Sequence, residues 1–133
     1  MMVELFEERD GPRVEMAALR EPNERWLGDH FGRDFSAWIA DLDGHPAASA
    51  ALMWYPHPPS PKNPLGLEAY ILNVYTVPGA RRMGLAKALI QRLVEEAQAV
   101  GVRRIWLRAS EVGRPLYEGL GFRASNYLQL TQD

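Results

Sequence analysis

Hydrophobic residues repeat at helical spacing in one long stretch in the second half of the chain. Between residues 85 and 100 the apolar positions recur at i, i+1, i+4 and i+5, and Gly101 follows the run. This spacing places the apolar side chains on one face of a helix of about four turns, and a glycine just past the last turn is a common helix end. The pattern predicts an amphipathic helix over residues 85–100.

Strand patterns lie on both sides of this helix. Apolar, β-branched and aromatic residues predict strands at 35–40, 47–55, 69–77, 102–109 and 122–130. Asp43-Gly44 is a turn signal, so the first two strands are expected to form a hairpin. Residues 56–64 are rich in proline, which cannot donate to a sheet ladder, and are predicted to form a stiff loop.

Helices are expected at both ends of this arrangement. In the first 34 residues Pro12 and Pro22 each stand where a first helical turn would begin, which predicts short helices there. A further short helix is predicted over residues 114–120. The order of elements favours an α+β fold, an α/β/α sandwich with a mixed, mostly antiparallel sheet. The length of 133 residues fits a single domain, 1–133.

Composition narrows the classes of function. The chain has no cysteine, which excludes a disulfide framework and a thiol nucleophile and favours a cytoplasmic protein. No apolar run is long enough to span a membrane, and without a long Lys/Arg stripe a nucleic-acid partner is not expected. The three histidines show no metal-ligand spacing, so no metal is expected. Residues 44–133 carry ten basic and six acidic side chains, which favours an anionic ligand.

The segment with the most specific chemistry joins the third predicted strand to the long helix. It reads Val77-Pro78-Gly79-Ala80-Arg81-Arg82-Met83-Gly84-Leu85-Ala86-Lys87. Amides at a helix N-terminus have no intrahelical acceptor and carry the positive end of the helix dipole, so they bind phosphate oxygens. Neither a Walker loop nor a dinucleotide fingerprint is present. A plain helix cap with solvated arginines is the alternative.

Two motifs in this order resemble the GNAT superfamily of acyl-CoA-dependent N-acyltransferases. Arg81, Gly84 and Ala86 match its Arg/Gln-x-x-Gly-x-Gly/Ala pattern, and Leu116 to Phe122 match its Leu-Tyr-Glu-x-Leu-Gly-Phe ending. One helix and one strand fit between them, as in the family. The resemblance extends over residues 35–130.

This resemblance implies an N-acetyltransferase that moves an acetyl group from acetyl-CoA directly to an amine of a small molecule or peptide. Strands 69–77 and 102–109 would splay apart, and the pantetheine arm would lie in the gap, added like a β-strand. The implied cofactor-binding residues are Tyr75 and Val77 through their backbone, Arg81, Arg82, Met83, Gly84, Leu85, Ala86 and Lys87 at the diphosphate, and Ser110 at the arm, where the family often has Asn. Ser110 as a mere helix cap is the alternative.

Tyr117 is the implied catalytic residue. A phenol of pKa ~10 can protonate the departing thiolate of coenzyme A; a core tyrosine is the alternative. The general base is not assigned, and Glu68 and Asn73 are the two candidates. The alternatives are that Glu68 is only a solvated charge at the end of a strand and that Asn73 is only a buried residue at a bulge.

The family's first strand hardly fits into the first 34 residues and is expected to be shortened or missing. A homodimer that covers the open sheet edge is therefore a hypothesis. The alternative function is a non-catalytic acyl-CoA-binding regulatory module, which the lack of a clear base favours.

Overall fold

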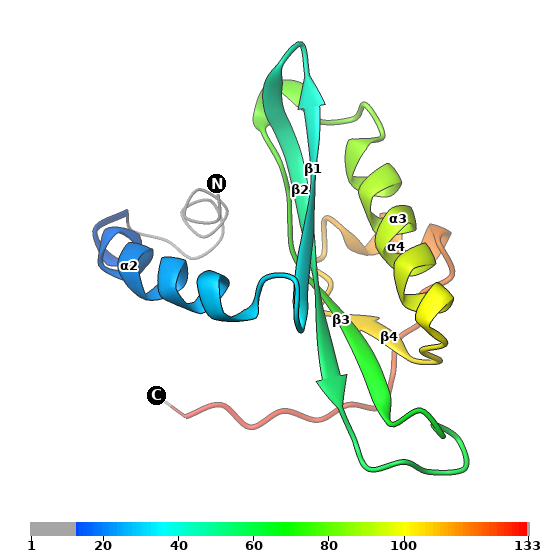
Figure 1. Cartoon of the computed structure of the whole chain (residues 1–133). Helices are drawn as coiled ribbons and strands as arrows, with labels where there is room; N and C mark the ends of the chain where they lie inside the picture. Colours follow the sequence, from blue (N-terminus) through cyan, green and yellow to red (C-terminus); the bar gives the residue numbers. More distant parts are fainter. Residues whose placement is uncertain (1–12, 133) are drawn as a thin grey trace.

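The structure, a computed structural model, describes residues 13–132. Its elements in chain order are α2 (Arg13–His30), β1 (Phe35–Leu42), β2 (His45–Pro56), β3 (Leu67–Thr76), the 3-10 turn η1 (Pro78–Ala80), α3 (Leu85–Val100), β4 (Ile105–Leu107) and α4 (Arg114–Gly119). The strands form one sheet, with α2 on one side of it and α3 and α4 on the other (Figure 1). This layering confirms the predicted α+β sandwich.

The sheet is mixed, as predicted. Its order is β1-β2-β3-β4, and only the pairing of β3 with β4 is parallel. The β1–β2 hairpin turns at Asp43 and Gly44, which have positive φ angles of 54° and 81°. Glycine adopts positive φ angles readily, and aspartate does so more often than most other residues. The Asp-Gly turn signal is therefore confirmed.

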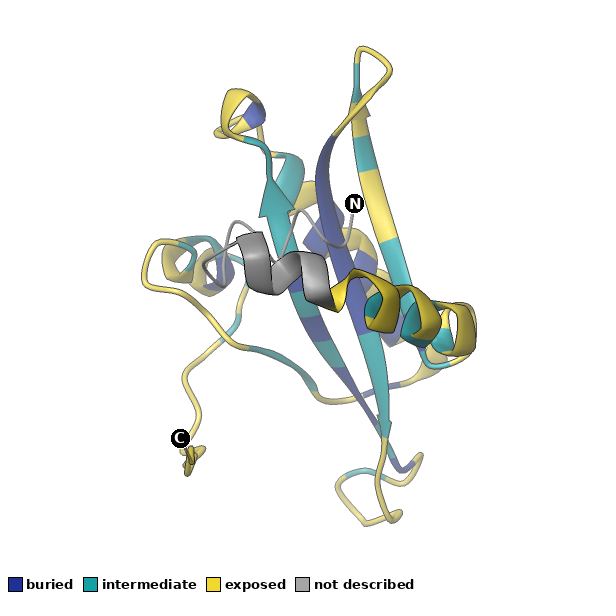
Figure 2. Ribbon diagram, turned by 90° about the vertical axis from the view of Figure 1, so that its left-hand side faces the viewer, coloured by how far each residue is buried: buried dark blue, intermediate teal, exposed yellow. Residues whose placement is uncertain are grey.

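The hydrophobic core fixes α3 against the sheet. Leu89, Ile90 and Leu93 on one face of α3 pack with Leu52 of β2 and Ile71 of β3. Figure 2 shows the corresponding stretches of the strands as buried. Each fully buried aliphatic side chain stabilises the fold by about 1.5–3 kcal/mol, so this packing holds α3 in place relative to β3. The predicted amphipathic helix over residues 85–100 is confirmed.

The N-terminal prediction needs a correction. Pro22 lies inside the single helix α2 and does not begin a new one. A proline frees one backbone carbonyl of the preceding turn, and at this exposed position water can solvate that group. Pro12 and the predicted helical segment around it lie outside the described residues.

Two predicted strands are also corrected. Residues 102–109 yield only Ile105–Leu107 as strand. Val102 N donates to Ala97 O at 3.2 Å and so completes the end of α3. Residues 122–130 form no strand, since no neighbouring strand pairs with them within the described chain.

Candidate active site

The pairing between strands β3 and β4 ends about halfway along β3. Their parallel pairing joins Ala69–Ile71 to Ile105–Leu107 and ends there, although β3 continues to Thr76. The cause lies at Asn73, which has a φ of 53° and lies where the β2–β3 register shifts between Ser49 and Ala51. A bulge bends its strand and breaks the regular ladder. The expected splay between the two strands is therefore present. Asn73 is a buried residue at a bulge, which was one of the two roles expected for it.

Hydrogen bonds to β2 decide which backbone groups at the end of β3 are turned away from that strand. Val77 N donates to Ala47 O at 2.9 Å, and Val77 O accepts from Ala80 N at 2.9 Å. Bonded and non-bonded pairs alternate along antiparallel strands, so Tyr75, opposite Ser49, turns its backbone groups toward β2 while Thr76 turns away from it. The pantetheine arm was expected to bind to backbone groups near Tyr75 and Val77, and Thr76 lies between these two residues.

Arg81 braces the turn after β3. Its Nε donates to Thr76 O at 3.0 Å, and its guanidinium lies 5.9 Å from the centre of the Tyr75 ring. The side chain therefore binds the end of β3 and holds η1 in shape. Its charge remains next to the start of α3.

The N-terminus of α3 is open to solvent. Gly84 is its N-cap, with a φ of 80° and no side-chain cap, and a Cβ placed there would meet no protein atom within 4 Å. Arg82 has a φ of 66° and turns the chain into the helix. The amides at the helix start, Leu85, Ala86 and Lys87, follow directly after a residue without a side chain. This arrangement leaves room for an anion to approach the backbone.

The charged side chains of this segment do not all lie at the N-terminus of α3. Arg82, Met83 and Lys87 are exposed beside the helix start. Arg92, two turns further on, lies 4.6 Å from the centre of the Trp38 ring instead. Trp38 Nε1 in turn donates to Glu96 at 3.1 Å, so Arg92 belongs to the contact between α3 and β1.

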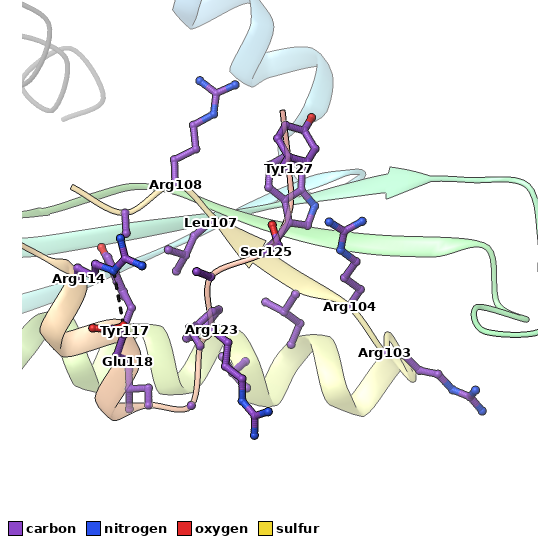
Figure 3. A pocket seen from close by; sticks show the side chains of 18 of the residues that line it. Arg103, Arg104, Leu107, Arg108, Arg114, Tyr117, Glu118, Arg123, Ser125 and Tyr127 are labelled. Atoms are coloured by element: carbon purple, nitrogen blue, oxygen red, sulfur yellow. Dashed lines mark ion pairs between the residues drawn. The ribbon is translucent and has the colours of Figure 1, made fainter. Parts of the chain in front are cut away.

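Tyr117, on α4, is buried close to the C-terminal end of β4. It is 9% exposed, packs its ring edge-on against Phe122 at 6.2 Å, and lines a hollow of about 720 Å³ together with Leu107 and Arg108 (Figure 3). A Cβ on Gly113 would come within 3.1 Å of the Tyr117 ring, so Gly113 makes the space for it.

Ser110 completes the turn before α4. Its hydroxyl oxygen accepts from Gly113 N at 3.1 Å, and its carbonyl accepts from Arg114 N at 2.9 Å. Ser110 therefore holds the turn before α4, whereas the N-cap of α4 is Gly113, which has no side-chain cap.

Glu68 belongs to a cluster of charges at the start of β3. Its carboxylate lies 3.2 Å from His57 Nε2 and 3.2 Å from the Arg104 guanidinium, and its side chain is 12% exposed. A solvated strand-end charge is therefore the wrong description. No sequence pattern indicates this cluster, because its members come from three separate segments.

Within 13–132 no three His, Cys, Asp or Glu side chains gather in a way that could hold a metal ion. In the same range no helix has the length and apolar character needed to cross a bilayer.

Comparison with curated proteins identifies relatives in one part of the chain. The [ribosomal protein bS18]-alanine N-acetyltransferase of Escherichia coli (strain K12) is 41% identical over 58 residues, which are 41% of this chain and 39% of that protein. The glucosamine 6-phosphate N-acetyltransferase of Trypanosoma brucei brucei is 44% identical over 55 residues, which are 41% of this chain and 37% of that protein. The matches thus span about two fifths of the length of these relatives.

Solved structures match nearly the whole chain. A GCN5-related N-acetyltransferase from Ralstonia eutropha JMP134 is 29% identical with a TM-score of 0.81, over 98% of this chain and 87% of that one. A predicted acetyltransferase with acetyl-CoA from Clostridium acetobutylicum is also 29% identical, with a TM-score of 0.78 over the same shares. The family model described as the acetyltransferase (GNAT) family matches residues 1–122. Since this match covers most of the sequence, the chain belongs to the acetyltransferase (GNAT) family.

Proposed function

We propose that this protein is an N-acetyltransferase that transfers the acetyl group of acetyl-CoA directly to an amine of a small molecule or peptide. One observation carries the proposal: the uncapped, solvent-open N-terminus of α3 begins at the end of a strand whose inner edge has parted from its neighbour. A diphosphate and an extended thioester arm need this combination. The curated relatives, both named as N-acetyltransferases, support it.

Donor binding divides between two parts of this site. The amides of Leu85, Ala86 and Lys87 would donate hydrogen bonds to the diphosphate. The Arg82 and Lys87 side chains would add positive charge, and Met83 would lie beside this site. Arg81 would act mainly by holding the turn. The Thr76 N–H, between Tyr75 and Val77, would donate to the pantetheine arm, since Thr76 O already accepts from Arg81. Ser110 accepts from Gly113, so its hydroxyl hydrogen can be donated to the arm.

The acetyl group passes directly from the thioester to the amine, without an acylated protein residue. The amine nitrogen attacks the thioester carbonyl carbon, and a C–N bond forms while negative charge collects on the carbonyl oxygen. Backbone donors at the gap stabilise that charge. The C–S bond then breaks and the sulfur takes the proton of the Tyr117 hydroxyl. The amine nitrogen gives up its proton to water, and water returns a proton to the Tyr117 oxygen, which restores the enzyme. Because the Glu68 carboxylate is held by His57 and Arg104, its role is to stabilise the start of β3.

Thiol release tests the function directly. The protein has no cysteine, so a thiol reagent reports only the coenzyme A that is set free. Incubation of acetyl-CoA with a panel of amines should release thiol in proportion to the acetylated amine found by mass spectrometry. Tight coenzyme A binding without turnover on any amine would instead support a non-catalytic acyl-CoA-binding regulatory module.

The setting of the enzyme is part of the same proposal. The lack of cysteine supports a location in the cytoplasm. Residues 1–133 would act as a single domain. An open strand edge favours pairing with another chain, which supports a homodimer.

A further inference from the structure

The two faces of β4 carry different side chains. Ile105 and Leu107 pack against the core that α3 covers. Side chains alternate along a strand, so Trp106, between these two residues, lies on the opposite face of the sheet. There its ring stacks on the ring of Tyr70 of β3, at 4.2 Å between centroids. Arg108 follows directly after the last residue of β4, and by the same alternation its side chain lies on the face of Trp106.

The proposed reaction needs access to the gap from both sides of the sheet. Figure 3 shows Tyr117 and Arg108 on opposite sides of β4. Helices α3 and α4 cover the side of Tyr117 (Figure 1), where the proposed function places the sulfur of coenzyme A. The amine therefore reaches the thioester carbon from the other side of the sheet, which is the side of Trp106 and Arg108.

The positive charge of Arg108 is not balanced by an acid within the described residues. Five arginines line the hollow beside β4, at positions 103, 104, 108, 114 and 123. Arg104 lies 3.2 Å from the Glu68 carboxylate. Arg114 lies 3.5 Å from the Glu118 carboxylate. Arg108 is exposed and makes no ion pair within residues 13–132, so its guanidinium can pair with an anionic group of a ligand.

The position of Arg108 distinguishes it from Arg103 and Arg123, the other two arginines of the hollow. The pairing between β3 and β4 ends at Ile71 and Leu107, so Arg108 is the first residue after β4 at the point where the gap opens. Arg103 precedes β4 at the opposite end of the strand. Figure 3 shows the Arg123 side chain on the side of β4 where α3 lies. Arg108 is therefore the arginine beside the path of the amine.

An unbalanced guanidinium at this position selects among amines. Most alkylamines are protonated at neutral pH, and like charges close together repel, so Arg108 disfavours an acceptor whose only charge is its ammonium group. A carboxylate or phosphate on the acceptor reverses this effect, because a guanidinium binds either group through two parallel hydrogen bonds. The charge therefore favours an acceptor that brings its own anionic group.

We propose that the acceptor is an amine that carries a carboxylate or a phosphate group, and that Arg108 binds this group. The inference rests on the proposed acetyl transfer and specifies the chemical class of its acceptor. The bonds that form and break are those of that reaction, and Arg108 takes part only through hydrogen bonds and charge. The stacked rings of Tyr70 and Trp106 lie on the same face and offer apolar surface to the body of the acceptor.

Matched pairs of amines test this selection. The members of each pair differ only in the anionic group: phenylalanine and phenethylamine, leucine and isopentylamine, phosphoethanolamine and ethanolamine. Thiol release from acetyl-CoA should give the wild type a kcat/KM at least about tenfold higher for the anionic member of one or more pairs. The amino acid pairs report a carboxylate site, and the phosphoethanolamine pair reports a phosphate site. Equal kcat/KM within every pair would overturn the proposal.

Substitutions at Arg108 show whether this side chain causes the preference. Arg108→Gln should raise KM for the preferred anionic amine about 10–100-fold, because charge-assisted hydrogen bonds are lost, and should not lower kcat/KM for its neutral partner. Arg108→Lys keeps the charge without the planar fork and should restore part of the loss. Arg123→Gln removes the same charge on the other side of β4 and should keep the wild-type preference. An equal fall for both members of the pair in Arg108→Gln, or an unchanged preference, would reject the assignment.

Binding of the acetylated products separates this inference from the proposed function. In calorimetry with the coenzyme A complex, the N-acetyl derivative of an anionic amine should bind at least about tenfold more weakly to Arg108→Gln than to the wild type. Such binding without thiol release on any amine would reject acetyl transfer and keep the anion site. Thiol release that depends neither on the anionic group nor on Arg108 would keep acetyl transfer and reject the anion site. The absence of both results would reject both proposals.

Discussion

Tyr117 is the residue whose chemistry is easiest to isolate. It is buried, held between Gly113 and Phe122, and its position depends on packing at the ring. The phenylalanine that replaces it keeps this packing and removes only the hydroxyl. Any change in turnover then reports the hydroxyl.

Tyr117→Phe should lower kcat about a hundredfold, in the range that general acids contribute, and leave the affinity for coenzyme A nearly unchanged. Steady-state thiol release measures both. Tyr127→Phe, at a tyrosine 64% exposed, is the control and should keep wild-type kcat. Equal kcat in the two variants would remove Tyr117 from the mechanism.

Glu68 makes a different prediction, because its carboxylate is argued to stabilise the fold. Glu68→Gln should lower the free energy of unfolding by about 1–3 kcal/mol, since hydrogen bonds to a charged group are lost in a mostly buried place. Glu118→Gln breaks the Arg114 pair, whose side chains are 55% and 56% exposed, and should change it by under about 1 kcal/mol. Urea titration compares the two. Equal stability losses would contradict the distinction.

At the scale of elements, the start of α3 is the critical feature. Gly84 begins the helix with a φ of 80° and Gly101 ends it with a φ of 100°. Both conformations disfavour a Cβ by about 1–2 kcal/mol. Only the first of these glycines lies at the proposed diphosphate.

Gly84→Ala should weaken coenzyme A binding roughly tenfold or more, because a Cβ hinders a charge-assisted contact worth about 1.5–3 kcal/mol. Gly101→Ala should lose similar stability and keep its affinity. Calorimetry of binding, with thermal unfolding beside it, separates the two effects. A parallel loss of affinity in both variants would mean that strain, and not the anion corner, explains the result.

The elements also show what sequence can and cannot predict here. The spacing over 85–100 and the Asp43-Gly44 turn depend on local patterns, and the structure confirms both. The direction in which the Thr76 backbone points depends on the hydrogen bond from Val77 to Ala47, which no local sequence pattern indicates. The Glu68 cluster joins segments that only the folded chain brings together. The strand expected over 122–130 has a strand pattern and no strand partner within residues 13–132.

At the scale of the whole molecule, ligand binding should stabilise the fold. The diphosphate corner and the gap lie on elements joined through one core, so coenzyme A should bind the native state alone. At a hundredfold excess over the dissociation constant the gain is about 2.7 kcal/mol, which corresponds to roughly 10 °C in Tm. Thermal unfolding with increasing coenzyme A measures it. An unchanged Tm at saturating ligand would contradict the proposed site.

A crystal structure of the protein with coenzyme A tests the central claim most directly. The account predicts the diphosphate on the amides of Leu85, Ala86 and Lys87, the arm beside Thr76, and the sulfur within hydrogen-bond reach of the Tyr117 hydroxyl. A ligand bound elsewhere while the first turn of α3 stays bare would contradict it.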